Sequence, residues 1–185
     1  NALQQTPFSI NKEVLMVLDT LWENNIFVDG LTSRESIEPP PYPFAVEPRD
    51  LNDEQRKEFK NWRGKKASIY QANAKSMSKR LQIERTIQLA KDFQKYDAFY
   101  YVWQLDFRSR KYPVSDFMNP QSADYGKALI KFAHGARIDQ EEDAAWLAIH
   151  GANCFGEDKI SLKDRIDWAY NIESDVVKTV EDPLN

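Results

Sequence analysis

The sequence has 185 residues, of which 42% are hydrophobic and 29% charged, an ordinary composition for a globular protein. No stretch approaches the roughly 20 apolar residues that a membrane span needs, and the single cysteine, Cys154, excludes an internal disulfide. The net charge of -4 conceals a segregation, because residues 56–95 carry 12 Lys and Arg against three acids. This asymmetry indicates a segment that faces a polyanion; the alternative is a solvated helix face that binds none.

Residues 9–24 are predicted to form a helix, because apolar side chains recur there at helical spacing. Either Ser9 or Asn11 can cap its start. Residues 25–51 contain five prolines, too many for a helix interior, and are predicted to be an extended connector.

The next segment begins with Asn52, which can form a capping box with Gln55. Helical propensity then runs to about Lys95, and Gly64 and the polar residues 71–78 suggest a break, so a hairpin of two helices is predicted. In the second half the apolar side chains share one face and the basic ones lie largely elsewhere. That pattern is typical of a helix that packs on one side and meets phosphates on the other.

Residues 99–103 are aromatic and β-prone, and residues 111–115 resume the pattern, which predicts two strands joined through residues 106–110. Pro113 places the second strand at an edge or a bulge. The aromatic run could stack bases, but a half-buried strand explains it better.

Four helices are predicted in the rest of the chain. Asp124 caps the first, which ends near Gly135; Asp139 opens the second, which closes around Gly151; Ser161 with Asp164 caps the third; and residues 174–180 form the last. The predicted fold class is α+β, predominantly α-helical, with a small antiparallel β hairpin.

The predicted turn between the strands carries the sharpest chemistry. Arg108 and Arg110 offer planar forks of donors that suit phosphate. Asp106 could pin one arginine and leave the other for a ligand. Composition alone favours a surface turn with an internal salt bridge.

The order of these residues resembles a palm motif of single-subunit RNA polymerases of phages and mitochondria: Asp or Thr, two variable residues, then Gly-Arg. Asp106, Arg108 and Arg110 match it, Tyr112 follows where the family often has tyrosine, and Ser109 departs from the usual glycine. The resemblance extends along nearly the whole chain. It includes residues 1–8, 10–11, 14–15, 115, 119–121, 127, 146–147, 149–154, 156–159 and 182–184.

The resemblance implies a division into the end of an N-terminal domain with its connector (1–50), a basic helical thumb-like region (51–97), the start of a palm (98–136) and a palm-insertion-like region (137–185). It implies that Arg108 and Arg110 contact the RNA–DNA hybrid and template, with Asp106 as their organiser. The other implied nucleic-acid-binding residues are Tyr112, Ser115, Lys127, Lys159, Lys75, Lys79 and Arg80.

In the resembled family, aspartates that bind two Mg²⁺ ions carry out nucleotidyl transfer. No matching segments occur here, so no metal ligand and no catalytic residue is expected in this chain, which alone is expected to be inactive. The expected partners are template DNA, the RNA–DNA hybrid, nucleoside triphosphates and the remainder of the polymerase, and no membrane. The expected location is the cytoplasm of a phage-infected bacterium, or alternatively a mitochondrion.

Two other functions fit the residues alone: a non-catalytic helical nucleic-acid-binding module or accessory subunit, and a protein-interaction fragment. His150 and Cys154, four apart, could suggest a metal pair or a nucleophile, but a zinc site needs more ligands than this chain offers. The acids of residues 141–143 are expected to be a solvated cluster at a helix start.

Overall fold

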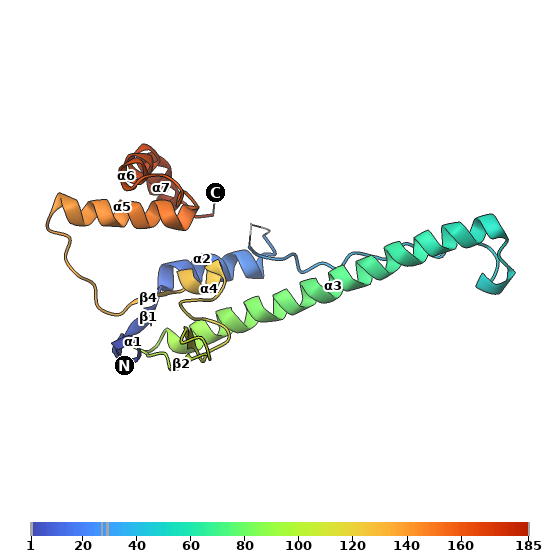
Figure 1. The fold of residues 1–185 in the computed structure, drawn as a ribbon, viewed down its shortest axis with the longest axis horizontal. Coiled ribbons are helices and arrows are strands. Elements are labelled where there is room, and N and C mark those ends of the chain that lie inside the picture. Colours follow the sequence, from blue (N-terminus) through green and yellow to red (C-terminus); the bar gives the residue numbers. More distant parts are fainter. Residues whose placement is uncertain (1, 27, 29, 185) are drawn as a thin grey trace. The chain divides into compact units, whose positions relative to one another are not determined.

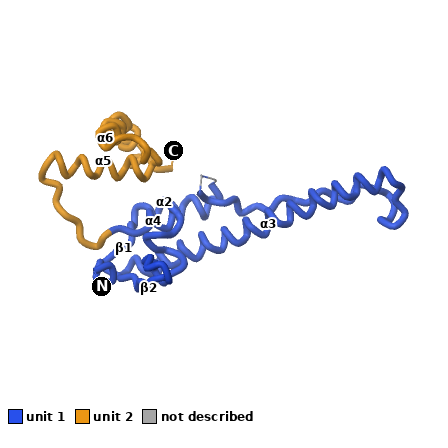
Figure 2. The backbone as a smooth tube through the Cα atoms, viewed as in Figure 1, with its two compact units in different colours: residues 1–131 blue, residues 132–185 orange. Residues whose placement is uncertain are grey.

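The computed structural model describes residues 2–26, 28 and 30–184. Residues 27 and 29, which belong to the predicted connector, and residues 1 and 185 lie outside the described part. The chain divides into two compact units, residues 1–131 and residues 132–185 (Figure 2), and each is described by itself.

The first unit alternates helices with very short strands. It contains α1 (Ala2–Gln5), β1 (Phe8–Ile10), α2 (Lys12–Glu23), the 3-10 turn η1 (Pro48–Asp50), α3 (Asp53–Phe93), β2 (Trp103–Leu105), β3 (Lys111–Pro113) and α4 (Asp124–Ala128), with β4 (Ile130–Phe132) at its end. β1 pairs with β4, and β2 pairs with β3. The predicted α+β class, mostly helical with a small antiparallel hairpin, is confirmed.

Helix α2 begins later than predicted, because Ser9 and Ile10 belong to β1. Asn11 is the cap, and its side chain accepts the amide of Val14. The apolar face of α2 shares one buried core with the C-terminal part of α3, with β1 and with the segment before β2. The buried core comprises Ile10, Leu15, Leu18, Trp22, Leu31, Ile83, Ile87, Ala90, Phe99, Tyr101, Met118 and Leu129.

Helix α3 is one helix of 41 residues, so the predicted break is wrong (Figure 1). Its start is as expected, because Asn52 and Gln55 form both bonds of a capping box. No proline lies within α3, and Gly64 keeps a negative φ, so the helical hydrogen bonds continue through it. A helical glycine costs about 1 kcal/mol, too little to end a helix that is packed elsewhere.

The predicted hairpin is confirmed, with shorter strands. Trp103 lies opposite Pro113 and Leu105 opposite Lys111. The aromatic run before it is extended, and Phe99 bridges to Phe8 rather than to the second strand. Phe99 and Tyr101 are buried whereas Tyr100 and Val102 are exposed, the alternation of a half-buried strand.

The helix predicted from Asp124 to near Gly135 is wrong in length and cap. α4 has five residues, and Ala123 rather than Asp124 precedes it as the cap position, with no side-chain bond. The chain then becomes β4, because the carbonyl of fully buried Leu129 accepts the amide of Asn11, at 2.9 Å. Pairing with β1 therefore outweighs the helical pattern.

The second unit contains α5 (Glu141–Phe155), α6 (Leu162–Asn171) and α7 (Glu173–Glu181). α5 starts two residues after Asp139 and passes through Gly151, so both predicted ends are wrong; it closes at Gly156, whose φ of 117° is the left-handed conformation that glycine favours. The Ser161 cap is confirmed. Among the described residues, no helix is long and apolar enough to cross a membrane.

Candidate nucleic-acid interface

The β2–β3 turn is organised by one carboxylate. Asp106 Oδ1 accepts the backbone amides of Arg108, at 2.8 Å, and Arg110, at 2.9 Å. The Ser109 amide donates to the Asp106 carbonyl, and the Asp106 amide donates to the Arg110 carbonyl. Aspartate at the first position of such a turn is favoured for this reason. Asp106 therefore holds the backbone of both arginines through hydrogen bonds, and its role as their organiser toward nucleic acid stays a prediction.

Ser109 adopts φ of 62°, the left-handed conformation. A β-turn followed by a left-handed residue is the usual three-residue hairpin loop, and glycine suits its last position. Serine there costs roughly 1 kcal/mol relative to an unstrained backbone. The turn thus keeps the glycine conformation without the glycine.

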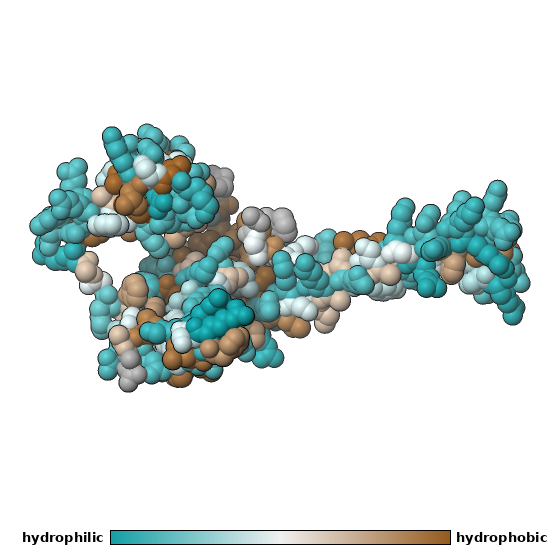
Figure 3. Space-filling view, in the orientation of Figure 1, coloured by the Kyte–Doolittle hydropathy of each residue, from teal (hydrophilic) through white to brown (hydrophobic). Residues whose placement is uncertain are grey.

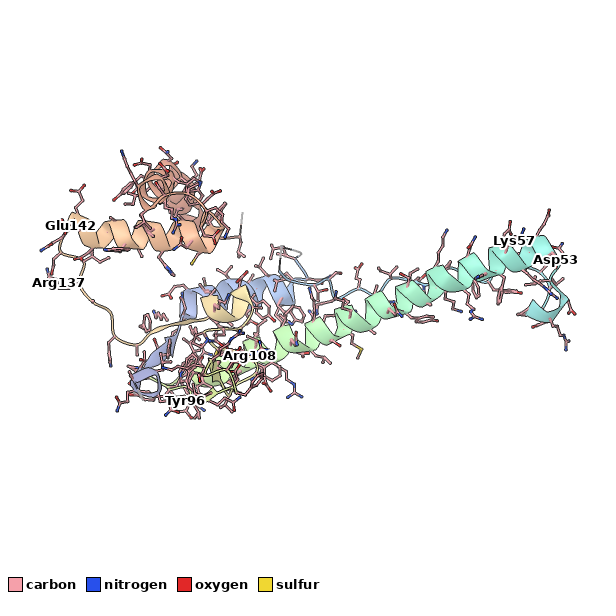
Figure 4. The ribbon with its side chains drawn as sticks, in the orientation of Figure 1. Asp53, Lys57, Tyr96, Arg108, Arg137 and Glu142 are labelled. Atoms are coloured by element: carbon pink, nitrogen blue, oxygen red, sulfur yellow. The ribbon has the colours of Figure 1, made fainter. Side chains whose placement is uncertain are left out.

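Both arginine side chains project from the turn and are exposed. The guanidinium of Arg108 lies over the ring of Phe107, with 5.0 Å from Cζ to the ring centre, and Phe107 itself is 89% exposed. The ion pairs of the described residues involve other side chains, so the alternative of a salt-bridged turn is wrong. Two donor-rich forks therefore stand available to a ligand. Arg108 is labelled in Figure 4.

Tyr112 and Ser115 follow the arginines along the same hairpin. Tyr112 lies opposite Gln104 in β3 and is 38% exposed. Ser115 is half-buried, and its carbonyl accepts the side-chain amide of Asn119 at 2.7 Å. The hairpin thus brings together Tyr112 and the two arginines, while Ser115 belongs to the loop that supports them.

Asn119 holds that supporting loop, a role that sequence reasoning did not assign. It is 5% exposed, and its Oδ1 accepts the Gln121 amide at 2.8 Å. Gln121 in turn donates from Nε2 to the Lys111 carbonyl at 3.0 Å, which ties the loop to β3. The Tyr101 hydroxyl donates to the Met118 carbonyl, and burial raises the pKa of that tyrosine. An Asn followed by proline was the only signal for this loop in the sequence.

Eight cations of α3 are exposed: Arg56, Lys57, Lys60, Arg63, Lys65, Lys75, Lys79 and Arg85. The predicted Lys75 and Lys79 belong to this set. Arg80 differs, because its guanidinium donates to the Arg34 carbonyl and to Ser36 Oγ. Figure 4 shows Lys57 near the far end of α3 from Arg108, and the space-filling view shows this end as hydrophilic (Figure 3).

The two remaining predicted lysines form ion pairs. Lys127 in α4 lies 3.2 Å from Asp124, and Lys159, in the second unit, lies 2.9 Å from Asp158. The hydrogen bond from Lys159 lowers the pKa of the Asp158 carboxyl. Both lysines are exposed, and their role with nucleic acid stays a prediction.

The described residues do not fit a metal site, since they contain no group of three or more His, Cys, Asp and Glu side chains arranged to hold an ion. His150 and Cys154 lie close, with 3.5 Å between Nε2 and Sγ, but no third ligand joins them. The acids Glu141, Glu142 and Asp143 lie in the first turn of α5, as expected.

Comparison with known proteins covers the whole chain. A family model described as DNA-dependent RNA polymerase matches residues 138–185. The RNA polymerase of Enterobacteria phage T3 is 35% identical over 187 residues, T7 RNA polymerase of Escherichia phage T7 is 32% identical over 186, and mitochondrial DNA-directed RNA polymerase 1 of Arabidopsis thaliana is 31% identical over 186.

Each alignment covers 100% of this chain and 18–20% of the relative, so the chain spans about a fifth of the length of the proteins it matches. Relatives come from phages and from plant mitochondria and chloroplasts. The similarity extends over both units of the structure. The chain belongs to the family of phage-type, single-subunit DNA-directed RNA polymerases.

Proposed function

We propose that this chain is the part of a DNA-directed RNA polymerase that holds the template and the RNA–DNA hybrid. The observation that carries the proposal is the Asp106 turn. Its carboxylate fixes the backbone of Arg108 and Arg110, at 2.8 and 2.9 Å, and leaves both guanidinium groups exposed. Such forks bind phosphate bidentately. A fixed backbone beneath them suits a ligand that must be held in one register.

The exposed cations of α3 supply a second, less directional contribution. Lysine binds phosphate as a point charge on a flexible stem, and its contribution to nucleic-acid affinity falls steeply with salt. Lys75 and Lys79 lie eight and four residues before Ile83, the first residue of α3 in the core. In this proposal α3 attracts the duplex, and the Asp106 turn sets its position.

The chemistry of nucleotide addition belongs to other parts of the polymerase in this proposal. The complete enzyme would use Mg²⁺ and nucleoside triphosphates, with carboxylates outside residues 1–185 as metal ligands. We further propose a phage origin, on the compact segment 151–159 that resembles phage members, and hence action in the cytoplasm of an infected bacterium. A mitochondrial location is the alternative that the organellar relatives leave open.

The test compares the chain with an Arg108→Ala, Arg110→Ala variant for binding to an RNA–DNA hybrid over a series of salt concentrations. We expect an affinity loss of roughly 100-fold and a salt slope shallower by roughly two. Arg49→Ala is the matched control, because Arg49 is an exposed arginine outside the turn and forms an ion pair with its neighbour Asp50. Equal affinity of the double variant and the control would end the proposal.

A non-catalytic nucleic-acid-binding module is favoured by one observation, the eight exposed cations of α3. It predicts binding that is untouched by the turn substitutions and lost when α3 is neutralised. It also predicts no preference for a hybrid over a DNA duplex. The same titration therefore separates the two functions.

A further inference from the structure

Residues 32–51, here called the strap, run along the outer part of α3 instead of crossing to another element (Figure 1). The outer part of α3, residues 53–80, precedes the turns that enter the core. The strap runs against the direction of α3, with its first residues near residues 73–80 of the helix and its last near the helix start. Thr32 meets Ser76 at 3.1 Å, and Leu51, near the other end, is 3% exposed and has its carbonyl bound by Arg56.

Asn73 binds the strap as a peptide group would. Its Oδ1 accepts the Ile37 amide at 2.9 Å, and its Nδ2 donates to the Ile37 carbonyl at 2.8 Å. Arg80, one helical repeat of seven further on, binds the Arg34 carbonyl and Ser36 Oγ. Two side chains of α3 thus satisfy backbone groups of a segment that has no sheet partner.

Trp62 holds the proline-rich part of the strap. Its indole N–H lies 3.1 Å from the Pro40 carbonyl and 2.8 Å from the Pro41 carbonyl. Tyr42 packs edge-on to Trp62 and to Phe59, at 5.4 and 6.1 Å between ring centres. Aromatic rings with an N–H donor directed at consecutive proline carbonyls are a recurring way to bind proline-rich segments, whose stiffness lowers the entropy cost of docking.

The outer part of α3 lies outside the core and needs packing from another segment to stay helical. At 1.5 Å per residue α3 is about 60 Å long, and helices in water depend chiefly on packing for their stability. Buried or half-buried positions recur along α3 at alternating spacings of four and three, first on the side of the strap and then in the core. They are Gln55, Phe59, Trp62, Lys66, Ile69, Asn73, Ser76, Arg80, Ile83, Ile87 and Ala90.

We propose that the strap is a proline-rich ligand bound in cis that keeps the outer part of α3 helical and leaves most of its cations free. Among the eight exposed cations, Arg56 bonds the strap, at the Leu51 carbonyl, and the other seven lie off the half-buried positions, so the strap and a polyanion occupy largely different sides of the helix. Asn73 and Trp62 are then positioning residues for the basic face. This consequence for nucleic acid rests on the function proposed above.

Hydrogen–deuterium exchange of the whole chain tests the strap, with Asn73→Ala and the milder Trp62→Phe, which keeps a ring and loses the N–H. We expect amides of residues 57–80 to exchange at least tenfold faster and those of residues 84–93 to be unchanged. Gln71→Ala is the control, since Gln71 is exposed on α3. Alanine is the better helix former than Asn or Gln, so faster exchange must come from lost strap contacts. Unchanged outer amides, or equal acceleration throughout α3, would overturn the proposal.

A second readout separates this proposal from the function. Dissociation of an RNA–DNA hybrid should be several-fold faster in both strap variants, with an unchanged salt slope, because no cation is removed. Faster exchange with unaltered hybrid dissociation would leave the strap standing and count against the nucleic-acid function. Unaltered exchange with faster hybrid dissociation would count against the strap and leave the nucleic-acid function standing.

Discussion

The Asp106 turn and α3 present positive charge in two different ways. In the turn, a single carboxylate fixes the backbone beneath two arginines that stand two residues apart. On α3, eight exposed cations are spread along a helix, and the ion pairs of the described residues involve none of them. Guanidinium groups on a fixed backbone can hold a nucleic acid in one register, whereas point charges spread along a helix attract it without fixing its position. The same ligand can therefore be drawn in by one region and positioned by the other.

Neutralising α3 should give the largest effect on affinity. Replacing Lys57, Lys60, Lys75 and Lys79 with Gln should weaken binding to any duplex by roughly 100-fold at low salt and make the salt slope shallower by roughly three. The measurement is a salt titration with hybrid and DNA duplex in parallel. A loss of affinity confined to the hybrid would show that α3 also positions the ligand. That result would contradict the division of roles between α3 and the Asp106 turn.

Asn119→Ala should act on the scaffold and not on the contacts. The buried side chain donates to the Ser115 carbonyl and accepts the Gln121 amide, so its loss should lower the free energy of unfolding by about 2–3 kcal/mol. Chemical denaturation checks the value. Because Asn119 carries no charge, the salt slope for hybrid binding should match that of the unaltered chain; a changed slope would mean that Asn119 touches the ligand.

Asp106→Ala should weaken hybrid binding by about tenfold, because the backbone amides of Arg108 and Arg110 lose their hydrogen bonds to the carboxylate. Asp106→Asn is the matched variant, since its carbonyl oxygen can still accept both amides. It should stay within roughly threefold of the unaltered chain. If Asn and Ala behave alike, the charge of Asp106 matters rather than its hold on the turn.

Ser109→Gly should give the smallest effect. Glycine removes the cost of the left-handed conformation at φ of 62° but adds backbone entropy to the unfolded chain. The net stabilisation should be no more than about 1 kcal/mol, with hybrid affinity unchanged. Thermal unfolding of the two chains measures it. Destabilisation would mean that the serine side chain makes a contact worth more than the strain.

The sequence predicted the features that depend on local chemistry. Caps at Asn11, Asn52 and Ser161 satisfy amides within three residues, and the hairpin follows from β-prone runs around a polar turn. Asp106 was predicted to hold an arginine in place. Its use of backbone amides could not be predicted, because the same composition fits an ion pair with either arginine.

What the sequence missed depends on partners far along the chain. Residues 71–78 look like a helix break because they are polar, but Asn73 and Ser76 bind the strap more than 30 residues away. Arg80 was predicted to bind nucleic acid, but its guanidinium binds Arg34 and Ser36 of the strap, which also lie more than 30 residues away. The segment after Leu129 has a helical pattern, yet pairing with β1, near the start of the chain, makes it a strand.

The most direct test of the central claim places a photoreactive group at the tip of the turn. Phe107, 89% exposed between the fixed amides, is replaced by benzoylphenylalanine, and the chain is irradiated on a labelled RNA–DNA hybrid. A control carries the same group at Met16, which is 62% exposed on α2. We predict crosslinks to the hybrid from position 107 and none from position 16. Equal crosslinking, or none from position 107 while the hybrid is bound, would contradict the assignment of the turn as the positioning contact.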